Sequence, residues 1–225
     1  MNIGIDKVQK AILYLIAFIL CIAAHEFGHA WVANRLGDPT PRMQGRLTLS
    51  PIHHIDLVGT IIMPIIMAFA TVPLLAWGRP VQINPAALSR RFSMRTGQML
   101  VAVAGPAMNL IMAIVVTIVI IIAAHLGATP KLLSGLFHYL VYLNISLMIF
   151  NLLPIPPLDG GSVLAWMLPR SQQHVVDFLA RYGFIILLVL FLTPALGSVF
   201  GAIISVPISL ITNLFLSIIN LAVGG

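Results

Sequence analysis

The sequence is poor in charge, and it contains only one cysteine and one glutamate. Charged residues make up 8% of its 225 residues, whereas a soluble domain carries about 25%. Hydrophobic residues make up 60%, and the mean hydropathy is +1.04. Nearly the whole chain is therefore predicted to lie in a membrane, without room for a separate soluble domain. The single cysteine, Cys21, excludes an internal disulfide, and we interpret it as a packing residue.

The charge that is present is mostly positive, with a formal net charge of +6. In a soluble protein such an excess suggests a nucleic-acid partner. Here the basic residues flank apolar segments, so lipid headgroups and membrane topology explain them better. We therefore expect the lipid bilayer as a partner and no nucleic acid.

Long apolar runs predict an all-α polytopic membrane protein. A run of about 20 apolar residues is long enough to cross a bilayer as a helix. We expect about five membrane-spanning helices, a re-entrant or sixth segment at 57–77, and a short β-like element at Gln44–Leu49 after the first helix. The chain is treated as one integral-membrane domain, 1–225, with a core at about 11–169 that holds the candidate site described below. The spans are predicted at 11–33, 97–125, 134–153 and, as a C-terminal helical hairpin turning near Pro194 to Ser198, at 183–223.

The distribution of basic residues bears on whether the segment 57–77 crosses the membrane. A crossing segment would divide the twelve basic residues eight to four. A re-entrant segment places all nine arginines on one side and all three lysines on the other, which is a stronger positive-inside bias. We therefore prefer the re-entrant path, with the N-terminus outside and the candidate site near the cytoplasmic face.

One stretch of the first predicted helix carries chemistry, and it reads His25-Glu26-Phe27-Gly28-His29. In this HExxH motif the three polar side chains share one helix face. Two imidazoles one turn apart can hold a metal ion, and the carboxylate can take a proton from water beside it. A pair of hydrogen-bonded helix histidines beside an acid is the alternative. We favour the metal site, because a buried carboxylate needs a partner to offset its desolvation.

A catalytic zinc ion usually takes three protein ligands, so the motif leaves one to be found. Asp159 stands out because it lies in a Pro- and Gly-rich break of an apolar segment, where an unpaired carboxylate is costly. Helix N-cap is the alternative role for Asp159, since a helix is predicted from Gly160 onward. The other candidates are His53, His54, Asp56, His125, His138, His174 and Asp177. His53, His54 and Asp56 cluster and could form a second metal or proton-relay site, although we favour interfacial polar groups.

Three motifs in order resemble the site-2 protease family of intramembrane zinc metalloproteases. They are the HExxH motif, Ala104-Gly105-Pro106 with Asn109, and Asn151-Leu152-Leu153-Pro154 running to Leu158-Asp159-Gly160. The stretch from Arg46 to Thr60 resembles a compact subgroup without a PDZ domain, although Ser50-Pro51 stands where that subgroup more often has Asn-Pro.

The resemblance implies one zinc ion held by His25, His29 and Asp159, with Glu26 as the catalytic base. It also implies that Asn151 contacts the substrate or the oxyanion of the reaction. Gly105 is expected to allow close helix packing, and Asn109 to hydrogen-bond across helices or to orient a ligand.

The predicted function is therefore that of an intramembrane zinc metalloendopeptidase. It would hydrolyse peptide bonds within or near the transmembrane segments of single-span membrane proteins, as in regulated intramembrane proteolysis, in a bacterial cytoplasmic membrane. An extended substrate could pair with an edge strand near Gln44–Leu49 or Val81–Ile83. A metal-ion transporter and a proteolytically inactive binder of membrane helices are the alternatives, and the lone glutamate beside the histidine pair fits hydrolysis better.

Overall fold

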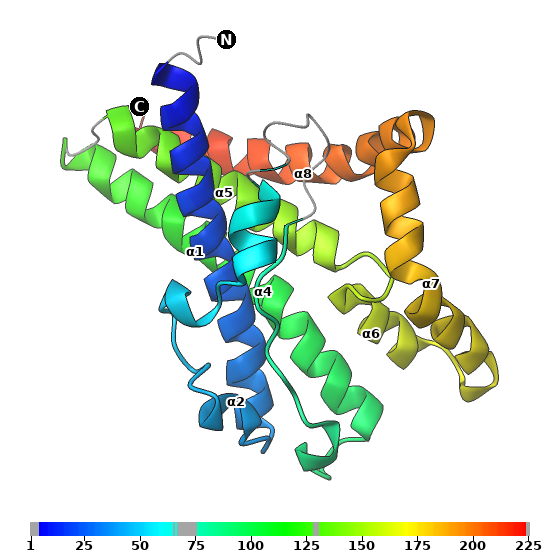
Figure 1. The fold of residues 1–225 in the computed structure, drawn as a ribbon. Coiled ribbons are helices and arrows are strands. Elements are labelled where there is room, and N and C mark those ends of the chain that lie inside the picture. The colour runs from blue at the N-terminus through cyan, green and yellow to red at the C-terminus, as the bar shows by residue number, and fades with distance from the viewer. Residues whose placement is uncertain (1–4, 65, 67–75, 128–130, 224–225) are drawn as a thin grey trace.

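The computed structural model describes residues 5–64, 66, 76–127 and 131–223, and these residues form helices and irregular loops without a β-strand. The predicted all-α class is confirmed for this part of the chain (Figure 1). The elements are α1 (Ile5–Arg35), α2 (Thr40–Met43), η1 (Pro51–His53), η2 (Leu57–Ile62), η3 (Pro85–Ala87), α4 (Met94–His125), α5 (Lys131–Asn151), α6 (Asp159–Met167), η4 (Arg170–Gln172), α7 (Gln173–Leu192) and α8 (Pro194–Val223).

Four helical segments are long and apolar enough to cross a membrane. They are Val8–Arg35, Met94–His125, Arg170–Leu192 and Ala195–Val223. The apolar stretch of α5, Gly135–Asn151, is shorter. The chain therefore has the helical make-up of an integral membrane protein, and the predicted number of about five spans stays a prediction.

The core that positions the site lies where α1, α4 and α5 pack together, and α8 packs against α4 and α5. Cys21 of α1 is buried there in one hydrophobic cluster with Val141 and Ile145 of α5, as the packing interpretation predicted. Small residues allow the close approach of α1 to α4. A methyl group at Gly28 would lie 2.9 Å from Met108 Cβ, so only glycine fits this contact without a shift of the helices.

The last two helices form a corner, whereas the sequence predicted an antiparallel hairpin. α7 ends at Leu192 and α8 begins at Pro194, and α8 then runs back across α4 and α5 (Figure 1). Proline at the first position of α8 is compatible with a helix start, because its missing N–H has no partner within a helix. The turn therefore lies at Thr193, directly before the predicted range Pro194 to Ser198, and α8 follows it as the second arm of a corner and not of a hairpin.

The segment predicted to cross or re-enter has ends that meet. The Trp77 N–H donates to Gly59 O at 3.2 Å, and the Thr60 hydroxyl donates to Trp77 O at 2.8 Å. The two ends of the segment 57–77 therefore lie side by side, which agrees with the re-entrant path. Residues 65 and 67–75, in the middle of this segment, lie outside the described residues.

The β-like element predicted at Gln44–Leu49 is a turn and an irregular loop in the structure. Gly45 has φ +67°, and the Arg46 N–H donates back to Pro41 O at 2.9 Å, so the chain continues the turn of α2 and does not extend. The buried Arg46 side chain donates to His53 O and Arg79 O, which ties this loop to the residues that follow Trp77.

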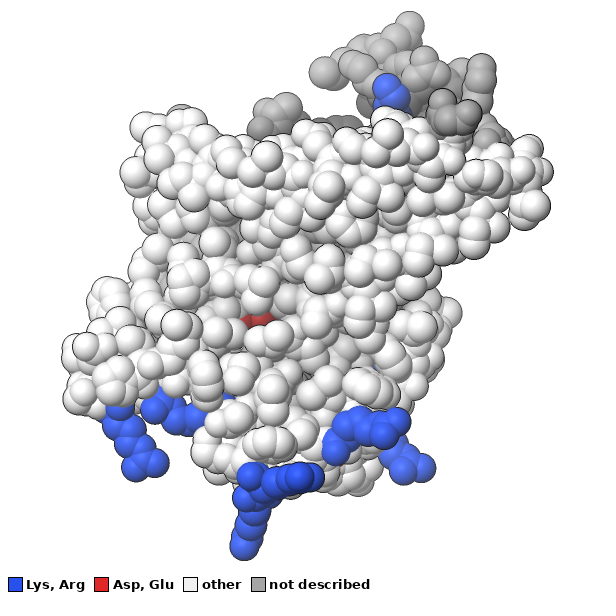
Figure 2. Space-filling model, turned by 180° about the vertical axis from the view of Figure 1, so that it is seen from behind, with Lys and Arg blue, Asp and Glu red and all other residues white. Residues whose placement is uncertain are grey.

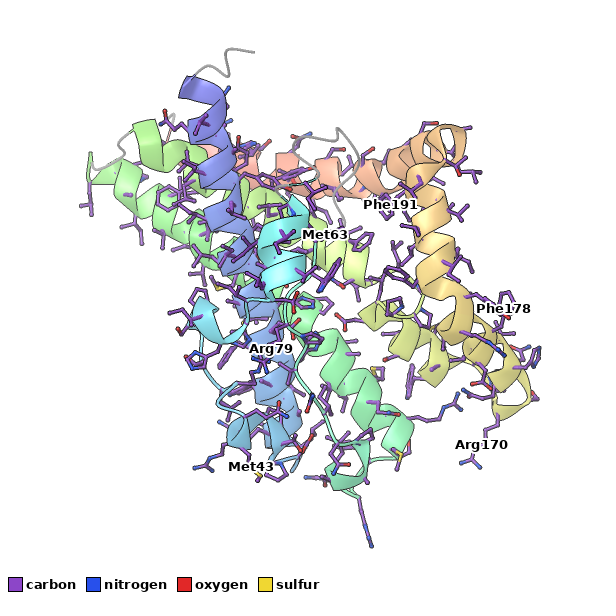
Figure 3. All side chains as sticks on the ribbon, in the orientation of Figure 1. Met43, Met63, Arg79, Arg170, Phe178 and Phe191 are labelled. Atoms are coloured by element: carbon purple, nitrogen blue, oxygen red, sulfur yellow. The ribbon has the colours of Figure 1, made fainter. Side chains whose placement is uncertain are left out.

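Basic side chains gather at one end of the molecule. Figure 2 shows most of the visible lysine and arginine side chains at the lower end, and the face above them is nearly free of charge. This end holds the C-terminus of α1 and the N-termini of α4 and α7, and Arg170 points away from the helices there (Figures 1 and 3). His25 lies ten residues before Arg35, so the HExxH motif is about 15 Å from the end of α1.

Candidate active site

The two histidines of the HExxH motif and Asp159 converge on one point. His25 and His29 lie one turn apart on α1, and Asp159 is the first residue of α6. The two histidine Nε2 atoms are 3.1 Å apart, and Asp159 Oδ2 lies 3.2 Å from the first and 3.4 Å from the second. Among the His, Cys, Asp and Glu side chains of the described residues, these three form the one cluster that could hold a metal ion.

The spacing of these atoms fits a bound zinc ion. Tetrahedral zinc ligands at about 2.0–2.1 Å from the metal lie about 3.3 Å from one another. Two imidazoles that both present lone pairs at 3.1 Å repel each other unless a cation lies between them. Asp159 Oδ2 is buried and has no hydrogen-bond donor among the described residues. Two imidazoles and one carboxylate are also a known ligand set for catalytic zinc.

The Nδ1 atoms of both histidines have acceptors that fix the direction of the rings. His25 Nδ1 lies 2.7 Å from Asn109 Oδ1 on α4, and His29 Nδ1 lies 2.8 Å from the carbonyl oxygen of Val101 on the same helix. With the ring proton on Nδ1, each imidazole turns the Nε2 lone pair toward Asp159. Asn109 thus orients a candidate ligand, which was one of the two roles predicted for it.

The alternative role of Asp159 as a helix cap is not what the structure has. Leu158 occupies the N-cap position of α6, without a side-chain cap hydrogen bond. Asp159 follows it in the first turn, and its carboxylate faces the histidine pair. The Pro- and Gly-rich break that marked this residue in the sequence is the loop that brings α6 back to α1 and α4.

Gly105 contributes space to the site. An added Cβ would lie 2.7 Å from His25 Cε1 and would overlap the Nε2 and Cε1 atoms of His29. The glycine of the Ala104-Gly105-Pro106 motif therefore leaves room for the two imidazole rings, beyond the helix packing that the sequence predicted.

Glu26 lies beside the histidine pair and is held by the backbone. The Val81 N–H donates to Glu26 Oε2 at 3.0 Å. Val81 belongs to a segment without helical structure that follows Trp77, and Arg79 and Asn84 anchor this segment at either side of Val81. The Arg79 N–H donates to His54 O at 2.9 Å, and the Asn84 N–H donates to the buried Asp38 carboxylate at 2.7 Å.

A cavity of about 390 Å³ lies in front of these groups, and Asn151 contributes to its wall. The Asn151 amide donates to Leu147 O at 3.0 Å, one turn earlier on α5. The predicted contact of Asn151 with a substrate or an oxyanion stays a prediction. The cavity is lined by the candidate ligands and Glu26, and also by Pro80, Val81, Ile83, Gln98, Pro157 and Ser162.

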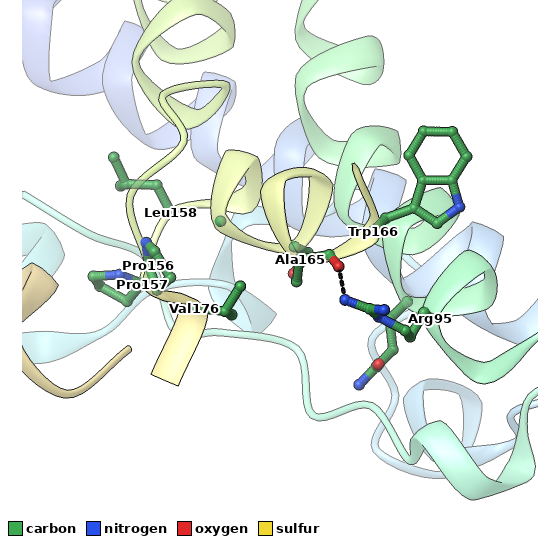
Figure 4. Close-up of a pocket in the computed structure, with 10 residues that line it drawn as sticks. Arg95, Pro156, Pro157, Leu158, Ala165, Trp166 and Val176 are labelled. Carbon is green, nitrogen blue, oxygen red and sulfur yellow. Dashed lines mark hydrogen bonds between the residues drawn. The ribbon is translucent and has the colours of Figure 1, made fainter. Parts of the chain in front are cut away.

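A second cavity of about 280 Å³ lies beside the first, between α4, α6 and α7 (Figure 4). The two cavities share Gln98, Pro157 and Ser162 in their linings, so they adjoin each other. Arg95 lines the second cavity and donates to the carbonyl oxygens of Ala165 and Leu168 at the end of α6.

The cluster of His53, His54 and Asp56 does not form a metal site in the described part of the chain. His54 Nε2–H donates to Thr48 O at 2.8 Å, and Asp56 accepts from the Gly59 N–H at the start of η2. These two side chains therefore organise the loop that leads into the segment 57–77. Burial lowers the pKa of His54, which keeps its imidazole neutral.

A family model described as Peptidase family M50 matches residues 13–129 and 119–190. This chain belongs to peptidase family M50. The membership confirms the resemblance to the site-2 proteases, and it identifies the chain as a hydrolase that acts on peptide bonds.

Three named relatives extend over most of the chain. The Bacillus subtilis protein YwhC, named as a candidate zinc metalloprotease, is 38% identical over 191 residues, which are 82% of this chain and 81% of YwhC. The Rip2 protein of Mycolicibacterium smegmatis, named in the same way, is 31% identical over 196 residues, which are 83% of this chain and 69% of Rip2. Rip2 of Mycobacterium tuberculosis is 30% identical over 202 residues, with 85% and 71% covered. No solved structure matches the chain.

Three contributions to the site were not found from the sequence. Val81 and Val101 act through backbone atoms, which carry no signal in a residue type. Asn144 on α5 hydrogen-bonds to Asn109 at 3.1 Å. It could have been found, because a lone amide in an apolar helix is costly unless it has a partner.

Proposed function

We propose that this M50 peptidase is an intramembrane zinc metalloendopeptidase that cuts membrane proteins within or next to their transmembrane segments. The observation that carries the proposal is the convergence of His25, His29 and Asp159 at 3.1–3.4 Å, with Glu26 beside them, inside an apolar helical bundle. The names of YwhC and Rip2 as candidate zinc metalloproteases support the choice of zinc.

His25, His29 and Asp159 would hold zinc through three ligand atoms and leave one position open for water or substrate. Zinc at this site would polarise the substrate carbonyl and make water more acidic. Glu26 is the base that takes the proton from the attacking water and passes it to the leaving nitrogen. Because the Val81 N–H holds Oε2, the carboxylate keeps a fixed orientation and Oε1 stays available for the proton. The Asn151 amide, in the wall of the same cavity, is a candidate donor to the oxyanion.

The residues from Arg79 to Asn84 offer an edge for an extended substrate. The Arg79 and Val81 N–H groups face His54 and Glu26, and in an extended chain the N–H of the next residue, Gln82, points to the opposite side. A substrate segment that has unwound from its helix could pair with that free edge. Gln82→Pro removes the N–H on this side and should lower cleavage without loss of zinc, whereas unchanged cleavage would refute the pairing.

The basic end of the molecule supports an orientation in a bacterial cytoplasmic membrane. Arginines concentrate on the cytoplasmic side of membrane proteins, so the end with the C-terminus of α1 is proposed to face the cytoplasm (Figure 2). The catalytic groups then lie about 15 Å inside that face. Single-span membrane proteins are the proposed substrates, and processing of this kind would serve regulated intramembrane proteolysis.

The test is zinc content and cleavage measured on the same purified samples. A panel of single-span substrates, with and without helix-breaking residues near the membrane boundary, is incubated with wild type and with Glu26→Gln. We expect stoichiometric zinc in both, cleavage only by wild type, and faster cleavage of the substrates with helix breakers. Asp177→Asn removes an exposed carboxylate of α7 and should behave as wild type. Cleavage by Glu26→Gln at the wild-type rate would overturn the assignment of the base.

A further inference from the structure

Two buried asparagines connect the candidate ligand His25 to the backbone of α5. Asn144 Nδ2 donates to Leu140 O at 2.8 Å, and Asn109 Nδ2 donates to Asn144 Oδ1 at 3.1 Å. Asn109 Oδ1 lies 2.7 Å from His25 Nδ1. Both asparagine side chains are 0% exposed, so water does not compete for these bonds.

We infer that Asn144 is a positioning residue that sets the tautomer of His25 through Asn109. The inference rests on the proposed function in one respect, which is that His25 is a metal ligand. Asn144 is not among the residues that line the cavity, and its side chain hydrogen-bonds to Asn109 and to Leu140 O, so we infer that it acts through Asn109.

The hydrogen bonds that run from Leu140 O through Asn144 and Asn109 to His25 form a relay. The carbonyl oxygen of Leu140 sets the direction of every hydrogen bond in it. Leu140 O is a backbone carbonyl and can only accept, so Asn144 must turn its NH₂ group toward it. The carboxamide oxygen of Asn144 then faces Asn109 and accepts from the Asn109 NH₂ group. Asn109 is left with its oxygen toward His25, and His25 Nδ1 must carry the ring proton.

The opposite arrangement fails at both ends. If both amides were turned over, the oxygen of Asn144 would face the oxygen of Leu140, and the NH₂ group of Asn109 would face His25 Nδ1. The ring proton would then move to Nε2, the atom that lies 3.2 Å from Asp159 Oδ2. An imidazole with its proton there has no lone pair for a metal ion.

The relay differs from the support of the second histidine. His29 Nδ1 donates directly to the Val101 carbonyl, which cannot turn over. His25 has a carboxamide in that position, which could present either end to the ring. Asn144 removes this freedom, which explains an amide deep in the apolar helix α5, far from any solvent.

The experiment measures the tautomer and the zinc affinity separately. In metal-free wild type with ¹⁵N-labelled histidine, NMR reports which ring nitrogen of His25 carries the proton, with the signal assigned by its loss in His25→Gln. We expect the proton on Nδ1. Asn144→Leu, close in shape to asparagine but without polar atoms, should increase the fraction with the proton on Nε2. It should also weaken zinc binding by about 10- to 100-fold, the usual range for residues that support a metal ligand.

Matched variants separate positioning from packing. At this buried position an aspartate is expected to be protonated, so Asn144→Asp donates through its O–H to Leu140 O and keeps the oxygen that accepts from Asn109. It should therefore bind zinc nearly as tightly as wild type. Asn213→Leu makes the same exchange at an exposed position of α8 and should have no effect on zinc binding. The relay also predicts that Asn144→Leu adds nothing to the loss caused by Asn109→Leu.

Two results would overturn the inference. One is a wild-type His25 with its proton on Nε2, which decides the matter even if Asn144→Leu does not fold. The other is a folded Asn144→Leu with wild-type zinc affinity. A wild type that binds no zinc would instead count against the proposed function, so the two failures are distinguishable.

Discussion

Gly105→Ala adds one methyl group to the wall of the metal site, and its effect can be worked out from the structure. In a helix such as α4, alanine is intrinsically favoured over glycine by about 0.5–1 kcal/mol. At Gly105 the methyl carbon would lie 2.7 Å from His25 Cε1 and overlap the His29 ring. Overpacking of this kind costs about 1–3 kcal/mol. The rings cannot turn aside freely, because hydrogen bonds to Asn109 and Val101 hold their Nδ1 atoms.

The net change in stability should therefore be small, from near zero to about 2.5 kcal/mol of destabilisation, while the metal site is lost. The measurement is zinc per chain at a buffered free zinc concentration, with thermal unfolding on the same sample. Gly201→Ala is the control, because a methyl group at this position of α8 would meet open space. It should keep its zinc and be as stable as wild type or slightly more so. A folded Gly105→Ala with wild-type zinc affinity would refute the described geometry.

Three further predictions concern the surroundings of the site. Asp38→Ala leaves the N–H groups of Thr40 and Asn84 without their acceptor. Thermal unfolding should show a loss of about 0.5–1.5 kcal/mol for each of these two part-buried hydrogen bonds, and a stability equal to wild type would contradict this. Burial lowers the pKa of His54, so the stability that its neutral form provides is fully present above about pH 6.5 and is lost as the pH falls further. His54→Gln should show a weaker loss of thermal stability than wild type between about pH 7.5 and about pH 5.5; an identical loss would exclude His54 as the cause. Gln98→Trp fills the junction of the two cavities and should slow cleavage while zinc stays bound. The control Gln172→Trp, at an exposed position, should cleave as wild type does. Equal cleavage rates of the two variants would show that substrates do not use the junction.

The convergence of His25, His29 and Asp159 could be predicted from the sequence because each of its signals is local. The i, i+4 spacing of His25 and His29 fixes their shared helix face. The break around Asp159 marks a carboxylate that needs a partner. The hydrogen bonds that orient His25 were predictable only in part. Asn109 belongs to a motif, whereas Asn144 is a single amide in an apolar run.

The parts that could not be predicted depend on contacts between distant segments. Gln44–Leu49 alternates like a strand, but the positive φ of Gly45 and the hydrogen bonds of Arg46 hold it as a loop. The contact of Val81 with Glu26 involves a backbone N–H that any residue except proline provides. Uniformly apolar helices such as α8 give no sign of which neighbours they cross, because almost every face is hydrophobic.

The ligand set of the metal is the central claim, and X-ray absorption at the zinc edge tests it most directly. The wild-type protein with one zinc ion should show two imidazole nitrogens and carboxylate or water oxygens at about 2.0–2.2 Å, without sulfur. Asp159→Ala should lose an oxygen ligand or the metal altogether. A zinc shell that is unchanged in Asp159→Ala, or one that contains fewer than two imidazoles in wild type, would contradict the site described for His25, His29 and Asp159.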